Sequence, residues 1–125
     1  MNATTPARAI ELFAECMNAG DIDGAMALYE PDAVFAPQPG QSISGHDAIR
    51  SALEGFVALQ PLMTGTIAQV LEAGDTALVT NRWALEGTGP DGEPVRMSGT
   101  SSDVVRRQPD GRWLVLVDDP WSAGG

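Results

Sequence analysis

Cysteine and histidine are nearly absent from this chain, with one of each among its 125 residues. The lone cysteine, Cys16, excludes an internal disulfide framework and fits a reducing, cytoplasmic compartment. The lone histidine, His46, leaves too few soft ligands for a zinc site, so we expect no metal and no cofactor. The chain also shows no signal-peptide pattern and no apolar run of about 18 residues, so we expect no membrane span.

Positively charged residues are also scarce. Seven Lys and Arg residues stand against seventeen Asp and Glu residues, which gives a net charge of −10. An acidic surface repels phosphate groups, so nucleic acids and anionic membranes are disfavoured as partners. The simplest interpretation of this charge is solubility.

The order of the expected elements predicts a single α+β domain over residues 1–125. Apolar residues at helical spacing predict helices over 5–20, 21–29 and 44–57. A brief strand over 33–36 follows the second helix. After the third helix, strands are predicted over 64–72, 76–86, 95–107 and 113–119, joined by tight turns. Helices followed by a run of antiparallel strands predict helices packed on one face of a sheet.

The two last turns assign side chains to the faces of this sheet. If the turns centre near Pro90 and Asp110, the odd-numbered residues of the last three strands share one face. We expect this more apolar face to meet the helices. It carries Val79, Asn81, Trp83, Leu85, Val95, Met97, Ser101, Asp103, Val105, Trp113, Val115 and Val117. The even face mixes polar and apolar residues and suits a wet oligomer interface better than a core.

Asp103 is the sharpest functional candidate, because this parity places a carboxyl group in mid-strand on the buried face. A buried carboxylate is costly unless it is paired, protonated or exposed to a cavity. In a cavity, a protonated carboxyl group can donate a hydrogen bond to a ligand oxygen. A shift of one residue in the register, or a hydrogen bond to helix backbone, would make the same residue purely structural.

Aromatic and aliphatic residues near Asp103 could line an apolar pocket with two polar groups, Asn81 and Ser101. The apolar candidates are Phe13, Tyr29, Phe35, Phe56, Trp83, Met97, Val117 and Trp121. Ordinary core packing is the alternative for most of them. Trp121 follows Pro120 near the chain end, where it either caps the pocket or crosses to a second subunit. Asp118 and Asp119 are adjacent and should point to opposite faces, which makes them a poor acid–base pair.

Three segments resemble the nuclear-transport-factor-like, or SnoaL-like, superfamily, which includes ketosteroid isomerase. They cover residues 18–24, 28–35 and 102–113, the last with an Asp-Gly-x-Trp ending. The resemblance implies a cone-shaped, cystatin-like α+β fold, with three N-terminal helices on a curved antiparallel sheet and a pocket between them. It also implies a homodimer formed through the outer sheet face. The most similar members are small bacterial proteins without an assigned reaction.

The resemblance matches only some of the functional residues of ketosteroid isomerase to residues of the same kind in this sequence. By its spacing to Gly111, Asp103 takes the place of the oxyanion-hole aspartate, and Tyr29 matches a supporting tyrosine. Phe13 stands where the family has a second donor tyrosine, and Pro37 stands at or near the general-base aspartate. Standard ketosteroid isomerisation is therefore not expected.

Two functions remain open from the sequence. The first is a small-molecule pocket protein, an isomerase- or cyclase-like enzyme acting on an apolar carbonyl compound, with Asp103 as the catalytic donor. The second is a non-catalytic module for ligand binding or association. The sequence alone does not decide between them, and it does not identify a ligand.

Overall fold

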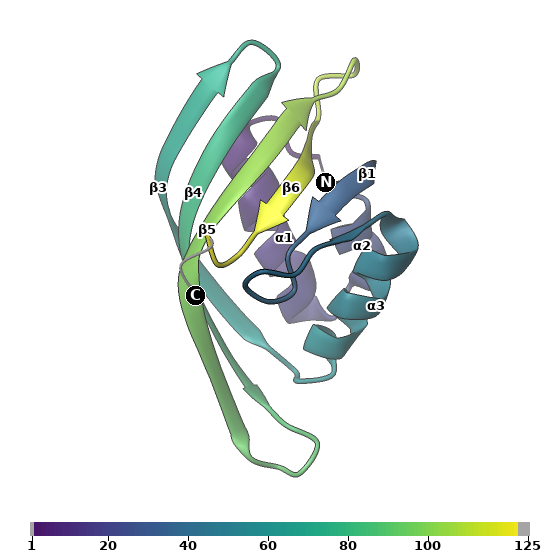
Figure 1. Ribbon diagram of the computed structural model, residues 1–125, viewed down its shortest axis with the longest axis vertical. Helices are drawn as coiled ribbons and strands as arrows, with labels where there is room; N and C mark the ends of the chain where they lie inside the picture. The colour runs from purple at the N-terminus through teal and green to yellow at the C-terminus, as the bar shows by residue number, and fades with distance from the viewer. Residues whose placement is uncertain (1, 123–125) are drawn as a thin grey trace.

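The computed structural model describes residues 2–122. Its helices are α1 (Pro6–Ala19), α2 (Ile22–Met26) and α3 (His46–Val57). Its strands are β1 (Tyr29–Phe35), β2 (Ile43–Ser44), β3 (Leu62–Ala73), β4 (Thr76–Thr88), β5 (Pro94–Arg107) and β6 (Trp113–Asp119). One sheet contains all six strands in the order β2-β1-β6-β5-β4-β3. The helices lie together on one side of this strongly curved sheet, which confirms the predicted α+β class (Figure 1).

The first helix begins and ends where its sequence predicts. The Thr5 hydroxyl accepts a hydrogen bond from the backbone N–H of Arg8 at 3.2 Å, and Pro6 occupies the first turn. Gly20 ends the helix with φ at +71°, a left-handed conformation that glycine adopts at little cost. The helix buries its apolar stripe against the sheet, including Leu12 and Met17. No helix among residues 2–122 is both long and apolar enough to cross a membrane.

The prediction that the second helix reaches Tyr29 is wrong. The helix ends at Met26, and Tyr29 instead begins β1, which runs to Phe35 and replaces the short strand expected over 33–36. This strand pairs in parallel with β6, whereas the other strand pairs are antiparallel. Pro31 is tolerated because the register shifts between Tyr29 and Val34. Pairing with a distant strand thus overrides the helical pattern of the local sequence.

A β-bulge in the last hairpin decides which side chains of β6 face the helices. The register is Val104 opposite Val117 but Val105 opposite Val115, so β6 carries one extra residue. The expected position of Val117 on the inner face is therefore wrong, because it lies opposite Val104 on the outer face. Asp118 takes the inner position instead, directly opposite Asp103.

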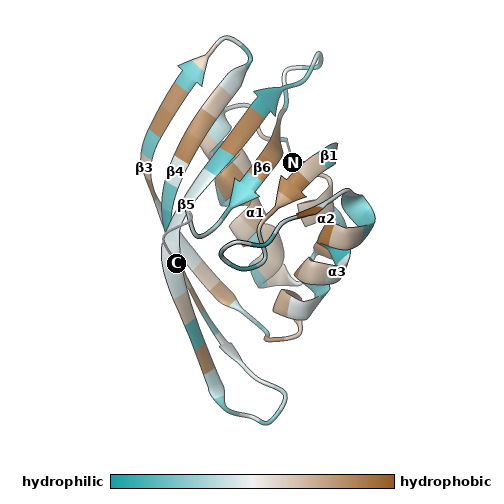
Figure 2. Cartoon of the chain, viewed as in Figure 1, coloured by the Kyte–Doolittle hydropathy of each residue, from teal (hydrophilic) through white to brown (hydrophobic). Residues whose placement is uncertain are grey.

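The core lies between the helices and the inner face of the sheet. Its largest fully buried side chains are Tyr29, Met17, Ile49, Leu53, Val79 and Val105. On the outer face, one row of paired apolar residues crosses four strands. Brown segments in Figure 2 mark apolar residues along β3, β4 and β5. This row, Leu71–Leu78–Val104–Val117, is called the outer row below. Leu71 and Leu78 are 53% and 40% exposed, so the row is open to solvent in the single chain.

Candidate functional site

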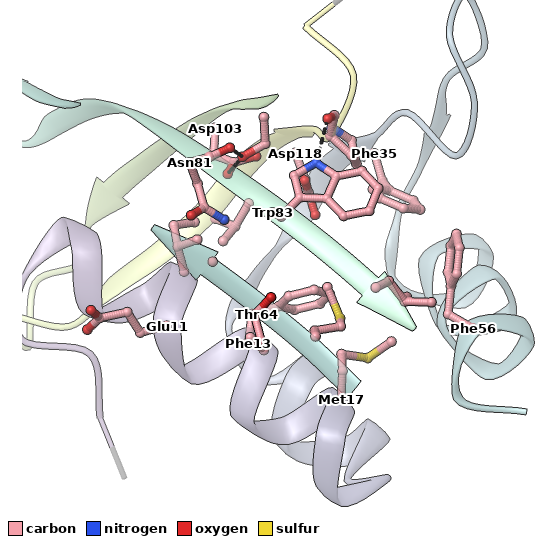
Figure 3. A pocket seen from close by; sticks show the side chains of 18 of the residues that line it. Glu11, Phe13, Met17, Phe35, Phe56, Thr64, Asn81, Trp83, Asp103 and Asp118 are labelled. Atoms are coloured by element: carbon pink, nitrogen blue, oxygen red, sulfur yellow. Dashed lines mark hydrogen bonds between the residues drawn. The ribbon is translucent and has the colours of Figure 1, made fainter. Parts of the chain in front are cut away.

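A cavity of about 220 Å³ lies between α1, α3 and the inner face of the sheet. Most of its wall is apolar, and the carboxyl groups of Asp103 and Asp118 lie together on one side of it (Figure 3). The residues that line it are Ile10, Glu11, Phe13, Ala14, Met17, Phe35, Leu53, Phe56, Met63, Thr64, Gly65, Ile67, Asn81, Trp83, Leu85, Ser101, Asp103, Val115, Asp118, Pro120 and Trp121. A mostly apolar wall with a few convergent polar groups is typical of small-molecule sites.

The structure brings most of the sequence-predicted pocket residues into this wall. Those that line the cavity are Phe13, Phe35, Phe56, Asn81, Trp83, Ser101, Asp103 and Trp121. Met97 and Val117 are not among the lining residues: Met97 pairs with Leu85 farther along the hairpin, and Val117 faces outward. Tyr29 lies just behind the wall, where it is 2% exposed. Their roles toward a ligand stay predictions.

The side chain of Asp103 is almost completely buried. The residue is 2% exposed, and its Oδ2 accepts a hydrogen bond from the Ser101 hydroxyl at 2.9 Å. Its Oδ1 is sequestered without a donor among the described residues. Burial raises the pKa of Asp103 well above its usual range, and the negative charge of the neighbouring Asp118 raises it further. Asp103 is therefore the member of the pair that keeps a proton.

Asp118 is a candidate site residue that the sequence pattern did not predict. Burial raises its pKa as well, but the neighbouring Asp103 and the hydrogen bond from Tyr29 lower it in part. The Tyr29 hydroxyl donates to its Oδ2 at 2.6 Å. The Tyr29 hydrogen bond thus favours the ionised form of Asp118. Because Asp103 and Asp118 lie directly opposite each other on neighbouring strands, the charge of each carboxyl group affects the pKa of the other.

The Tyr29 hydroxyl stays protonated, and its ring is held in one position by its neighbours. Burial raises the pKa of Tyr29 well above its usual range, and the negative charge of Asp118 adds to the effect, so the hydroxyl keeps its proton. The ring packs edge-on against Phe13, with centroids 5.9 Å apart. Because Tyr29 lies on a strand rather than a helix, its side chain reaches β6 directly.

Two tryptophans close the other side of the cavity. The indole N–H of Trp83 donates to the carbonyl of Pro120 at 2.8 Å, and that of Trp121 donates to the carbonyl of Ala36 at 3.1 Å. The two rings are edge-to-face with centroids 5.3 Å apart. Trp121 therefore forms part of the pocket wall of its own chain.

The titratable residues that line the cavity are all acidic: Glu11, Asp103 and Asp118. No group of three or more His, Cys, Asp or Glu residues within residues 2–122 is placed to hold a metal ion. His46 lies on the exposed start of α3, where its Nε2 is 3.0 Å from the carbonyl oxygen of Tyr29. All seven basic residues of the chain are arginines, so no lysine amine is available as a nucleophile. The chemistry that this site can supply from its own groups is proton transfer.

A family model, the SnoaL-like domain, matches residues 10–115 of the chain. The sequence matches no curated protein. Among solved structures, a candidate dehydratase of the NTF2-like family from Streptomyces avermitilis is similar, with 23% identity and a TM-score of 0.78 over 90% of each chain.

Two further structures are similar to this chain at low identity. A candidate scytalone dehydratase from Novosphingobium aromaticivorans has 16% identity and a TM-score of 0.79, over 90% of this chain and 77% of the other. A candidate calcium/calmodulin-dependent protein kinase II association domain from Xanthomonas campestris has 20% identity and a TM-score of 0.75, over 90% and 81%. At these identities the likeness establishes the NTF2-like fold alone.

Proposed function

We propose that this chain, which belongs to the SnoaL-like domain family, is an isomerase- or cyclase-like enzyme that moves a proton on a small apolar carbonyl compound. The observation that carries this proposal is the placement of Asp103 and Asp118, which lie opposite each other at the wall of an apolar cavity, both with a raised pKa. Standard ketosteroid isomerisation stays outside the proposal, because Phe13 and Pro37 carry no acid or base.

The pair supplies both halves of an acid–base reaction. Ionised Asp118 takes a proton from the carbon next to the carbonyl group, and protonated Asp103 gives its proton to the carbonyl oxygen. The C–H bond breaks, an O–H bond forms, and an enol results. Returning the proton to another carbon would give an isomer, and attack of the enol carbon on a second carbonyl would close a ring. Positioned proton transfer of this kind contributes about 10² to 10⁴ in rate.

A test that needs no knowledge of the natural substrate uses 5-nitrobenzisoxazole. A positioned base removes its ring proton, the N–O bond breaks, and a coloured phenolate forms. We expect saturable turnover that is lost by about 100-fold or more in Asp118→Asn. The rate should rise with pH through a midpoint above the usual aspartate range, because burial raises the pKa of Asp118.

Glu11→Gln is the matched control, since Glu11 is a carboxyl residue that lines the cavity but is exposed and outside the pair. It should leave turnover within about twofold of the wild type. Turnover that is equal in the wild type and Asp118→Asn would refute the catalytic proposal. The chain would then fit the alternative, a non-catalytic module for ligand binding or association.

We also propose that two copies associate through the outer sheet face. The outer row presents four aliphatic residues across β3, β4, β5 and β6, flanked by polar residues such as Thr80 and Ser102. A second copy would bury this row against itself around a two-fold axis, as in most homodimers. The similar structure from Xanthomonas campestris is described as an association domain, which supports this use of the fold.

A further inference from the structure

The charge of the cavity wall selects the kind of ligand that can enter. Among residues 2–122, Glu11, Asp103 and Asp118 line it, and no Arg or His residue does. An anionic ligand would have to approach the ionised member of the pair in a largely apolar wall without a compensating cation, which is costly. An uncharged ligand meets no such repulsion. The cavity is therefore suited to neutral compounds and not to carboxylates.

Most of the neutral polar groups in the wall already donate hydrogen bonds to other groups of the protein or lie on its exposed surface. The Ser101 hydroxyl donates to Asp103, and both indole N–H groups donate to backbone carbonyls. Thr64 lies on an exposed part of β3. Asn81 remains, and its side-chain amide makes no hydrogen bond with the described residues.

The side-chain amide of Asn81 lies in the space left by the missing side chain of Gly65. Asn81 lies opposite Ile67 on one neighbouring strand and opposite Ser101 on the other. A Cβ atom at Gly65 would lie 2.8 Å from Asn81 Oδ1 and 3.1 Å from Nδ2, so the amide occupies space that only glycine leaves open. Oδ1 is sequestered without a partner, which leaves the NH₂ group as the end that can reach a ligand (Figure 3).

Asn81 is also placed at a useful distance from the carboxyl pair. Its partner Ser101 precedes Asp103 by two residues on the same face of β5. Asn81 is thus a diagonal neighbour of Asp103, at about 7–8 Å between backbones. A ligand oxygen held at Asn81 would direct the adjoining carbons toward the pair.

We infer that Asn81 is the specificity-determining residue of this site, and that its amide donates to the oxygen of a neutral carbonyl compound. The inference rests on the proposed small-molecule site and names the ligand class that the site takes. The amide distinguishes a ketone from a hydrocarbon of the same shape, and the acidic wall distinguishes a ketone from a carboxylate.

Three probes of nearly equal size test this inference by calorimetric or tryptophan-fluorescence titration: acetophenone, ethylbenzene and benzoate. In the wild type at pH 7, acetophenone should bind at least 100-fold more tightly than benzoate. Asn81→Leu should weaken acetophenone binding about tenfold, as expected for one lost hydrogen bond, and leave ethylbenzene binding unchanged or tighter. Gly65→Ala should give the same selective loss, because the new methyl group displaces the amide.

Ile67→Val is the control, since Ile67 lines the cavity opposite Asn81 but has no polar atom. It should change acetophenone and ethylbenzene binding by the same factor. Equal losses for both probes in Asn81→Leu, no loss in either, or benzoate binding as tight as acetophenone would overturn the inference. Selective binding without turnover of 5-nitrobenzisoxazole would refute catalysis alone, and turnover without selectivity would refute the role of Asn81 alone.

Discussion

Replacement of Asp103 by Asn should change how the stability of the protein depends on pH. In the folded chain, burial and the neighbouring Asp118 raise the pKa of Asp103 well above its usual range. In the unfolded chain the same carboxyl group titrates near its ordinary value of about 4. Between these two values the folded state holds a proton that the unfolded state has released, so stability falls as pH rises.

The size of this effect follows from the linkage of one proton. While the folded carboxyl group stays protonated and the unfolded one is ionised, the free energy of unfolding falls by about 1.4 kcal/mol per pH unit. Asn resembles the protonated acid in shape, but it has no proton to release. Relative to the wild type, Asp103→Asn should therefore gain about 1.4 kcal/mol per pH unit above pH 4, until the raised pKa is reached.

Urea unfolding at pH 4.5, 5.5 and 6.5 measures this difference directly. We expect the two stability curves to diverge by up to about 3 kcal/mol over these two units, with the variant favoured at the higher pH. Glu11→Gln, which removes an exposed carboxyl group of the same cavity, controls for the change in net charge. Parallel curves for Asp103→Asn and the wild type would show that Asp103 ionises normally in the folded chain.

Three other substitutions test separate parts of the structure. Tyr29→Phe removes the 2.6 Å hydrogen bond to Asp118, so the pKa of Asp118 should rise. The midpoint of the pH–rate profile with 5-nitrobenzisoxazole should then move to higher pH. An unchanged midpoint would show that this hydrogen bond does not affect the pKa of the catalytic base. Leu78→Asp places a charge in the outer row, so it should convert the proposed dimer to a monomer in sedimentation velocity. The control Ser51→Asp, on the exposed side of α3, should leave the dimer intact. A wild type that is monomeric at high concentration would refute the proposed interface. Trp121→Phe removes the hydrogen bond to Ala36 and should lower the free energy of unfolding by about 1 kcal/mol in urea titration; a loss below a few tenths would show that the bond contributes little.

Local sequence patterns account for most of the secondary structure. The stripe that ends at Met17 and the stop at Gly20 define α1 without reference to the rest of the chain. The turn near Pro90 likewise predicts that odd-numbered residues of β4 and β5 share a face, as Val79 and Asp103 do. These features depend on neighbours close in sequence, which is why periodicity and turn residues suffice to predict them.

Two features depend on contacts between distant segments and could not be predicted in this way. Tyr29 leaves the helical pattern because β1 pairs with β6, about 90 residues later in the chain. The bulge in β6 moves Asp118 to the inner face, and no turn residue signals it. A one-residue shift exchanges the two faces of a strand, so face parity without the bulge does not place Asp118 beside Asp103.

The proposal that Asp103 and Asp118 share one proton is tested most directly by following the side-chain carboxyl ¹³C resonances of both residues from pH 2 to pH 10. The resonances should titrate together in two steps, with the upper step well above the ordinary aspartate value of about 4, and Tyr29→Phe should displace the steps. Two independent titrations near that ordinary value would mean that each carboxyl group ionises alone, and the proposed acid–base pair would not exist.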